Sequence, residues 1–257
     1  MRHELILILD FGSQYTQLIA RRLRELGVKT TIERGDLPTA GIRAADPIAL
    51  VLSGGPSSVF EEGALQVDPE IFNLGVPVLG ICYGMQLVAR DLGGLVESSD
   101  QREYGLAELE VVSDTSILKG TPSRQTVWMS HGDHVTRVPE GFEVLGRTGN
   151  SPVAAMADPR RRLIALQFHP EVRHTPNGTT MLESFIEIAG ARRDWNPAAI
   201  RHELVDRLRE SIPQGRVICG VSGGVDSSVT TVLLREAVGD RVSPIFVDTG
   251  LLRKDEG

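Results

Sequence analysis

The sequence has 257 residues, of which 41% are apolar and 24% charged, and this composition is that of a globular protein with one large domain or two small ones. The formal net charge of −7 argues against a general affinity for nucleic acid, because an acidic surface repels phosphate backbones, although a local phosphate site remains possible. The apolar runs are too short to cross a bilayer or to form a signal peptide, and two cysteines make no disulfide framework, so we expect a cytoplasmic protein without a membrane partner.

The first part of the chain alternates between predicted strands and predicted helices. Leu18, Ile19, Leu23 and Leu26 recur at helical spacing, and Gly27 follows them where a C-cap glycine is expected. Strands that alternate with helices favour a parallel sheet covered on both faces. Four short apolar runs predict its strands, at residues 4–9, 28–32, 48–52 and 76–81, and a second helix is predicted over residues 84–92.

Between residues 104 and 168 the pattern changes to short β-rich runs separated by Gly, Pro, Asp and Asn. Runs at residues 106–112, 125–130 and 163–168 predict further strands, some of them antiparallel. Apolar side chains on one side of residues 177–189 then predict another helix.

A polar segment at residues 190–197 marks a boundary. Asn196 followed by Pro197 is typical of an N-cap and a first helical position, and an apolar stripe predicts an amphipathic helix that ends at Pro213. A fresh β–α–β pattern follows, with runs at 216–221, 227–238 and 242–247. We therefore expect a first domain over residues 1–192, a helical linker over 193–213, and part of a second, parallel α/β domain over 214–257.

Cys82 stands between two glycines, in Gly80-Ile81-Cys82-Tyr83-Gly84, where a predicted strand meets a predicted helix. This is the G-x-nucleophile-x-G form of a strand-to-helix elbow, which needs glycine where close neighbours leave no room for Cβ atoms. The elbow would place the sulfur at a helix N-terminus, where the helix dipole stabilises negative charge. The other interpretation is that Cys82 is a small buried hydrophobe.

His169 is the best candidate for a base beside a cysteine nucleophile. Pro170 favours an extended conformation at His169, so His169 and Glu171 would point to the same side. An imidazole beside a carboxylate is the base and orienting group that such a nucleophile requires. An isolated His-Pro-Glu can also be an accident of a loop.

A stretch that follows the third predicted strand, Ser53-Gly54-Gly55-Pro56, would lie at the same carboxyl edge of the sheet as Cys82. Bare backbone amides at Gly54 and Gly55 could then face a substrate. The alternative is an ordinary tight turn.

Together the three motifs resemble the class I, triad-type glutamine amidotransferases, whose fold is an open mixed sheet with flanking helices. The resemblance implies that Cys82 attacks the amide of glutamine, that His169 is base and acid, and that Glu171 orients His169. It implies oxyanion N–H groups at Gly55 and Tyr83, and no cofactor for glutamine hydrolysis. Glutamine would be held by Gly54, Gln86, Ser130, His131, Gly132 and Asp133, although His131 and His134 also fit plain loop histidines.

A second glycine-rich loop follows the strand at residues 216–221, and Cys219 in that strand is expected in a core. The loop lacks the spacing and the lysine of a Walker A motif, and it would offer backbone N–H groups to an anion at a helix N-terminus. It resembles the pyrophosphate loop of the ATP pyrophosphatase family. The resemblance implies that Asp226 assists the Mg²⁺ site and that residues 248–254 lie near the nucleoside. The alternative interpretation is that the loop only caps the helix. The implied ATP-binding residues are Ser222, Gly223, Gly224, Val225, Asp226, Ser227 and Ser228.

The order of the two motif sets resembles the family of glutamine-hydrolysing GMP synthetases. That resemblance implies that ammonia from glutamine aminates XMP to GMP with ATP and Mg²⁺ as a substrate complex, in a homodimer formed through a C-terminal domain beyond residue 257. We expect this chain to be a fragment that hydrolyses glutamine weakly and does not make GMP. The rival interpretations are a non-catalytic interaction module and a stand-alone glutaminase that serves a separate synthetase.

Overall fold

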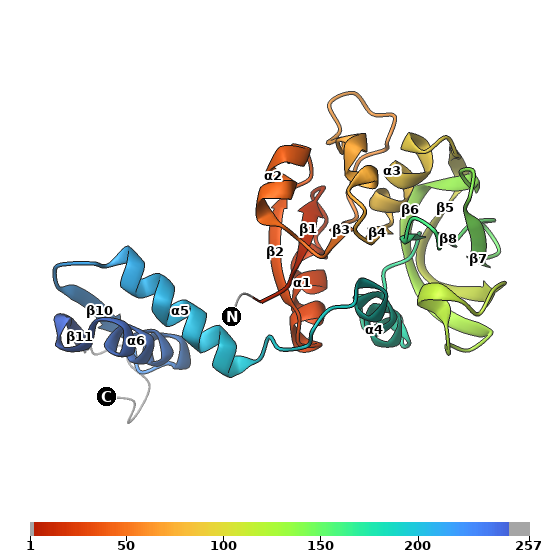
Figure 1. Ribbon diagram of the computed structural model, residues 1–257. Coiled ribbons are helices and arrows are strands. Elements are labelled where there is room, and N and C mark those ends of the chain that lie inside the picture. Colours follow the sequence, from red (N-terminus) through yellow and green to blue (C-terminus); the bar gives the residue numbers. More distant parts are fainter. Residues whose placement is uncertain (1–2, 247–257) are drawn as a thin grey trace. The chain divides into compact units, whose positions relative to one another are not determined.

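A computed structural model describes residues 3–246, and for residues 99–102 it describes the backbone alone. The chain divides into two compact units, Met1–Asp194 and Trp195–Gly257 (Figure 1). Each unit has its own sheet and its own hydrophobic core. No helix in the described range 3–246 is long and apolar enough to span a membrane.

The first unit is built on one nine-stranded sheet with the strand order β2-β1-β3-β4-β9-β8-β7-β5-β6. The strands from β2 to β9 in this order run parallel, as expected from the β–α alternation, and the remaining pairs are antiparallel. The predicted mixed sheet is thus confirmed. The strands are β1 (Leu5–Asp10), β2 (Lys29–Arg34), β3 (Ala49–Leu52), β4 (Val78–Ile81), β5 (Leu95–Val111), β6 (Arg124–Arg137), β7 (Glu143–Arg147), β8 (Ala155–Asp158) and β9 (Leu163–Leu166).

Helices cover both faces of the parallel half, as the sequence predicts (Figure 1). In β1, Ile6 and Ile8 pack in the cluster with α1 (Thr16–Glu25) and α4 (Gly178–Ala189). Leu7 and Leu9 point to the other face, toward α2 (Thr39–Ala45) and α3 (Tyr83–Asp91). Because both faces are covered, the strands are apolar at successive positions rather than at alternate ones.

The antiparallel half is longer than the sequence pattern suggests. β5 has 17 residues and pairs with β6 over most of its length, with register shifts between Leu95 and Val96 and between Ser98 and Glu103. The first half of β5 is polar and contains no apolar run. The sequence therefore predicts this strand only from residue 106 onward. The short helix α2 and the 3₁₀ turns η1 (Pro69–Asn73) and η2 (Ser116–Leu118) also carry no clear periodic signal.

The second unit begins with α5 (Pro197–Ser211), and Asn196 Oδ1 accepts hydrogen bonds from the N–H groups of Ala198 and Ala199, which confirms the predicted N-cap. Two parallel strands, β10 (Val217–Val221) and β11 (Val242–Phe246), flank α6 (Val225–Val238), and a 3₁₀ turn, η3 (Gly239–Arg241), precedes β11.

The core of this unit is small and includes Cys219, as predicted, with Leu234, Val238 and Val242. Position 247 of the predicted last strand and the predicted nucleoside segment 248–254 lie outside the described residues.

Candidate active site

Cys82 occupies a sharp turn between β4 and α3. Its backbone has φ 52° and ψ −105°, an uncommon conformation for a residue with a side chain, which costs about 1–3 kcal/mol and persists only where its surroundings enforce it. The Cys82 N–H donates to Leu166 O at 2.7 Å, and so ties the turn to β9. The strand-to-helix elbow predicted from the sequence is present, and its backbone is strained at Cys82.

The two glycines of the elbow are required by space. A methyl group built on Gly80 would lie 2.7 Å from Gly84 O, and one built on Gly84 would overlap the backbone oxygen of Leu52. Real Cβ atoms do not approach backbone atoms so closely, so α3 packs against β3 and β4 only because these positions lack side chains. The glycines therefore set the position from which Cys82 faces the cavity.

His169 and Glu171 follow β9 and come together as the sequence predicts. His169 Nδ1 lies 2.7 Å from Glu171 Oε1, and the two residues are 3% and 1% exposed. Cys82 and His169 line one cavity, and a methyl group built on Gly54 would lie 3.1 Å from His169 Cε1 and 3.6 Å from Cys82 Cβ. Residues separated by 87 positions of sequence thus form one contiguous set, which argues against the interpretation of Cys82 as a mere buried hydrophobe.

The electrostatics of the set favour a charged imidazole. Burial lowers the pKa of His169, but the negative charge of Glu171 and hydrogen bonds with Cys82 and Glu171 outweigh burial, so the pKa of His169 lies well above its ordinary value. The Tyr15 ring meets His169 edge-on at a centroid distance of 4.9 Å. Arg22 Nε donates to the backbone oxygen of Glu171 at 3.2 Å and holds that segment against α1.

The Ser53-Gly54-Gly55-Pro56 stretch lies beside the elbow and is more than a connecting turn. Ser53 O accepts from the Gly84 N–H at 3.1 Å, and Ser53 Oγ accepts from the Phe11 N–H at 3.0 Å, so the stretch is bonded to α3 and to the end of β1. A methyl group on Gly55 would lie 2.8 Å from Phe11 O. Within residues 3–246, no acceptor is bonded to the backbone N–H of Gly55 or Tyr83.

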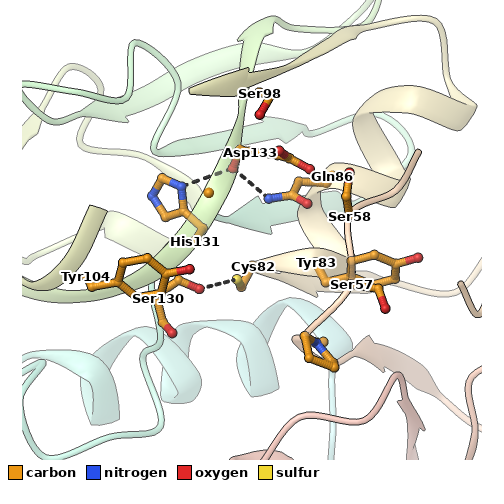
Figure 2. Close-up of a pocket in the computed structure, with 13 residues that line it drawn as sticks. Ser57, Ser58, Cys82, Tyr83, Gln86, Ser98, Tyr104, Ser130, His131 and Asp133 are labelled. Carbon is orange, nitrogen blue, oxygen red and sulfur yellow. Dashed lines mark hydrogen bonds between the residues drawn. The ribbon is translucent and has the colours of Figure 1, made fainter. Parts of the chain in front are cut away.

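A cavity of about 420 Å³ opens beside Cys82 (Figure 2). It contains most of the predicted glutamine-binding residues: Gln86, Ser130, His131, Gly132 and Asp133, with the predicted oxyanion residues Gly55 and Tyr83. Gly54 is not part of the lining. It lies beside His169, as shown by the 3.1 Å distance between a methyl group built on Gly54 and His169 Cε1. The lining of the cavity also includes Pro56 of the glycine-containing stretch, and residues that the sequence did not single out, namely Ser57, Ser58, Ser98 and Tyr104.

Hydrogen bonds shape the far wall of this cavity. Figure 2 shows Asp133 O between two side chains: it accepts from Gln86 Nε2 at 2.8 Å and lies 3.0 Å from His131 Nδ1. Cys82 Sγ lies 3.4 Å from Ser130 O. His131 is thus no plain loop histidine, since its ring is buried and bonded on both sides.

A second cavity of about 270 Å³ reaches Cys82 from the side of His169. It is walled by the turn after β1, with Gly12, Ser13, Gln14 and Tyr15, none of which the sequence pattern singled out. The signal that could have found it is the position of that turn at the carboxyl end of β1, which pairs in parallel with β3.

The glycine-rich loop of the second unit connects β10 to α6 and is exposed. Gly223 has φ 82°, and no side chain caps the helix N-terminus at Gly224. The serines bond within the loop, for example Ser228 Oγ to Gly224 O at 2.8 Å. Asp226 lies in the first turn of α6, and no group of three or more His, Cys, Asp or Glu side chains in the described range could hold a metal ion.

Comparison with known proteins identifies the family of the chain. Residues 7–189 match the class-I glutamine amidotransferases. A glutamine-hydrolyzing GMP synthase of Lactococcus lactis subsp. lactis is 51% identical over 254 residues, which are 98% of this chain and 50% of the relative. One from Staphylococcus aureus (strain Newman) is 50% identical over 255 residues, or 99% of this chain and 50% of the relative.

A solved structure from Thermoplasma acidophilum, designated a candidate component of GMP synthase, superposes with a TM-score of 0.68 at 33% identity, covering 74% of this chain and 96% of that chain. The present chain spans about half the length of the two curated relatives described above. The family match extends over well more than half of the chain, and the chain therefore belongs to the class-I glutamine amidotransferases.

Proposed function

We propose that this protein hydrolyses glutamine at Cys82 and that the ammonia serves the amination of XMP to GMP. The observation that carries the first part is the meeting of Cys82, His169 and Glu171 at a strained elbow beside a cavity. Glutamine is the substrate expected of the family, and the cavity of about 420 Å³ has the size of a small-molecule site.

In the first half-reaction the thiol proton of Cys82 passes to His169, and the Cys82 sulfur attacks the side-chain amide carbon of glutamine. The carbonyl oxygen becomes an oxyanion, and the N–H groups of Gly55 and Tyr83 are the donors available to stabilise it. His169 gives its proton to the amide nitrogen, the C–N bond breaks, and ammonia leaves with a γ-glutamyl thioester on Cys82.

In the second half-reaction His169 takes a proton from water as the water oxygen attacks the thioester carbon. The C–S bond then breaks, glutamate leaves, and the sulfur returns to its starting state. Glu171 holds His169 Nδ1 throughout and stabilises the imidazolium, which is the function of the carboxylate in a nucleophile–base–orienter triad.

The amino-acid end of glutamine fits the wall opposite Cys82. Gln86 Nε2 is engaged by Asp133 O, and within the described residues Gln86 Oε1 is bonded to no donor. An amide oxygen of this kind is a suitable acceptor for the substrate ammonium group. Backbone groups of Ser130 to Asp133, which line the cavity, are the remaining candidates for the carboxylate end.

The use of ammonia for GMP synthesis is supported by the names of the similar proteins and by the loop at residues 222–228. An uncapped helix N-terminus preceded by Gly223 in a left-handed conformation can present backbone N–H groups to phosphates. Asp226 would hold Mg²⁺ that arrives on ATP, because Mg²⁺ usually takes one or two carboxylates together with phosphate oxygens. ATP would supply the AMP group that activates XMP.

The two cysteines provide the test of the glutaminase. Glutamate release from L-glutamine should disappear in Cys82→Ala and persist in Cys219→Ala, because Cys219 is buried in the core of the other unit. Equal release by Cys82→Ala and the unchanged protein would overturn the proposal. Formation of GMP should be measured with XMP, Mg²⁺–ATP and glutamine in the complete polypeptide, and ammonia should replace glutamine when Cys82 is changed.

A further inference from the structure

A second buried pair of histidine and carboxylate lies on the glutamine side of Cys82 and takes no part in the steps above. Glu103 on β5 and His131 on β6 stand directly opposite each other in the antiparallel ladder, so their side chains share one face of the sheet. Glu103 Oε2 lies 3.3 Å from His131 Nε2, and the two side chains are 11% and 3% exposed. A buried carboxylate needs such a partner to offset its loss of water.

Two hydroxyl groups complete the surroundings of the Glu103 carboxylate. Ser151 Oγ donates to Oε2 at 2.9 Å, and Thr148 Oγ1 donates to Oε1 at 3.0 Å. Burial raises the pKa of Glu103, but hydrogen bonds from His131, Ser151 and Thr148 outweigh it, so the pKa of this carboxyl lies below its ordinary value. Glu103 is therefore an ionised acceptor with both oxygens engaged.

The opposite nitrogen of His131 faces the substrate wall. Nδ1 lies 3.0 Å from Asp133 O, which cannot donate, so this bond requires a hydrogen on Nδ1. Nε2 lies against the Glu103 carboxylate and 3.5 Å from Ser151 Oγ. His131 therefore spans the distance between Glu103 and the Asp133 carbonyl, with one ring nitrogen beside each.

Asp133 O is consequently fixed from two directions. His131 Nδ1 and Gln86 Nε2 both donate to it, which accounts for the two lone pairs of a carbonyl oxygen (Figure 2). The Asp133 carbonyl is thus a fixed acceptor within the wall of the cavity. It positions the adjoining backbone of Gly132 and the side chain of Gln86 for glutamine.

We propose that Glu103 is a positioning residue for glutamine, which holds His131 so that His131 and Gln86 together fix the Asp133 carbonyl in the wall of the substrate cavity. The inference rests on the proposed glutaminase function. Glu103 does not touch the reacting atoms, so its loss weakens the binding of glutamine and leaves the reactivity of Cys82 unchanged. A merely structural role would affect both or neither.

The test measures binding without turnover. In the Cys82→Ala background, titration calorimetry with L-glutamine gives the dissociation constant for Glu103→Ala, Glu103→Gln and a control, Glu108→Ala. Glu108 lies on the same strand, but its side chain is 68% exposed. Glu103→Ala should bind at least tenfold more weakly, Glu103→Gln should be intermediate because its amide oxygen still accepts, and the control should match the parent.

The reactivity of Cys82 supplies the second readout. With Cys82 present, alkylation by iodoacetamide, which has no amino-acid end, should proceed within about twofold of the parent rate in Glu103→Ala, and Glu103→Gln serves if the alanine variant does not fold. Unchanged glutamine affinity, or equal losses of affinity and alkylation rate, would overturn the assignment. If the parent itself neither binds nor hydrolyses glutamine, the proposed function has failed and the assignment falls with it.

Discussion

His169 Nδ1 lies 2.7 Å from Glu171 Oε1, and both side chains are almost wholly removed from solvent. Both residues follow β9, which brings them to the carboxyl edge of the sheet next to the elbow at Cys82. The sequence predicts an extended segment here, whereas Pro170 and Glu171 belong to a turn, and this turn brings the carboxylate to the imidazole. Burial lowers the pKa of His169, and the charge of this carboxylate is the main reason that the pKa is nevertheless high. The pair therefore controls both the orientation and the charge of the proposed base.

Glu171→Gln should lower the pKa of His169, because the amide keeps the shape but removes the negative charge while burial continues to disfavour the imidazolium. Glutamine hydrolysis should fall by about two orders of magnitude or more, as expected when a catalytic histidine loses its orienting carboxylate. An NMR titration of the His169 ring measures the pKa directly. The matched control is Glu187→Gln on α4, whose side chain is 75% exposed, and an unchanged pKa in Glu171→Gln would contradict the expectation.

The high pKa of His169 also predicts how stability depends on pH. The folded protein binds a proton at His169 that the unfolded chain releases near its ordinary pKa of about 6.5, so the contribution is complete below that value. It is lost as the pH rises through the folded-state pKa, at up to about 1.4 kcal/mol per pH unit.

Denaturant unfolding at several pH values above 6.5 tests this dependence. The free energy of unfolding should fall with pH more steeply in the parent than in His169→Gln, and His202→Gln, at a side chain that is 79% exposed, should follow the parent. Parallel curves for the parent and His169→Gln would show that the proton is not held as proposed.

Gly84→Ala should disrupt the elbow, because the new methyl group would overlap the backbone oxygen of Leu52 and force α3 away from β3. The expected loss of stability is about 1–3 kcal/mol, as for overpacking of a tight core, and the alkylation rate of Cys82 should change as well. Gly149→Ala is the control, since no atom lies within 4 Å of a methyl group built there. Thermal unfolding and iodoacetamide labelling measure the two effects, and a Gly84→Ala protein equal to the control in both would refute the close-packing argument.

Gly223→Val should remove phosphate binding by the second unit. Gly223 has φ 82°, which a β-branched residue adopts only with strain, so the substitution should disturb the backbone that leads into α6. Broadening of the ³¹P signal of Mg²⁺–pyrophosphate reports binding. Gly239→Val, at φ 63° on the far end of the same helix, is equally strained and should retain it. Retention of the signal by both variants would favour the helix-cap interpretation of the loop.

Much of the fold could be predicted from local pattern. Apolar runs gave the parallel strands to within a few residues, and Asn196 with Pro197 correctly marked the start of α5, because caps and buried strands leave their signal in neighbouring residues. The first half of β5 and the helix α2 were missed. β5 is polar there, and its strand conformation depends on pairing with β6, a partner that local periodicity cannot reveal.

Residue types and their local spacing predict the candidate chemistry, because a cysteine between glycines and a histidine and a carboxylate on either side of a proline form a specific pattern. The surroundings of these residues depend on contacts between distant parts of the chain. Glu103 meets His131 through a cross-strand register with an irregularity in it. Tyr15 meets His169 because β1, β3, β4 and β9 are neighbours in the sheet. These contacts join residues that are far apart in the chain. They form because folding covers apolar faces and pairs buried polar groups, and the local spacing of residues does not reveal such long-range contacts.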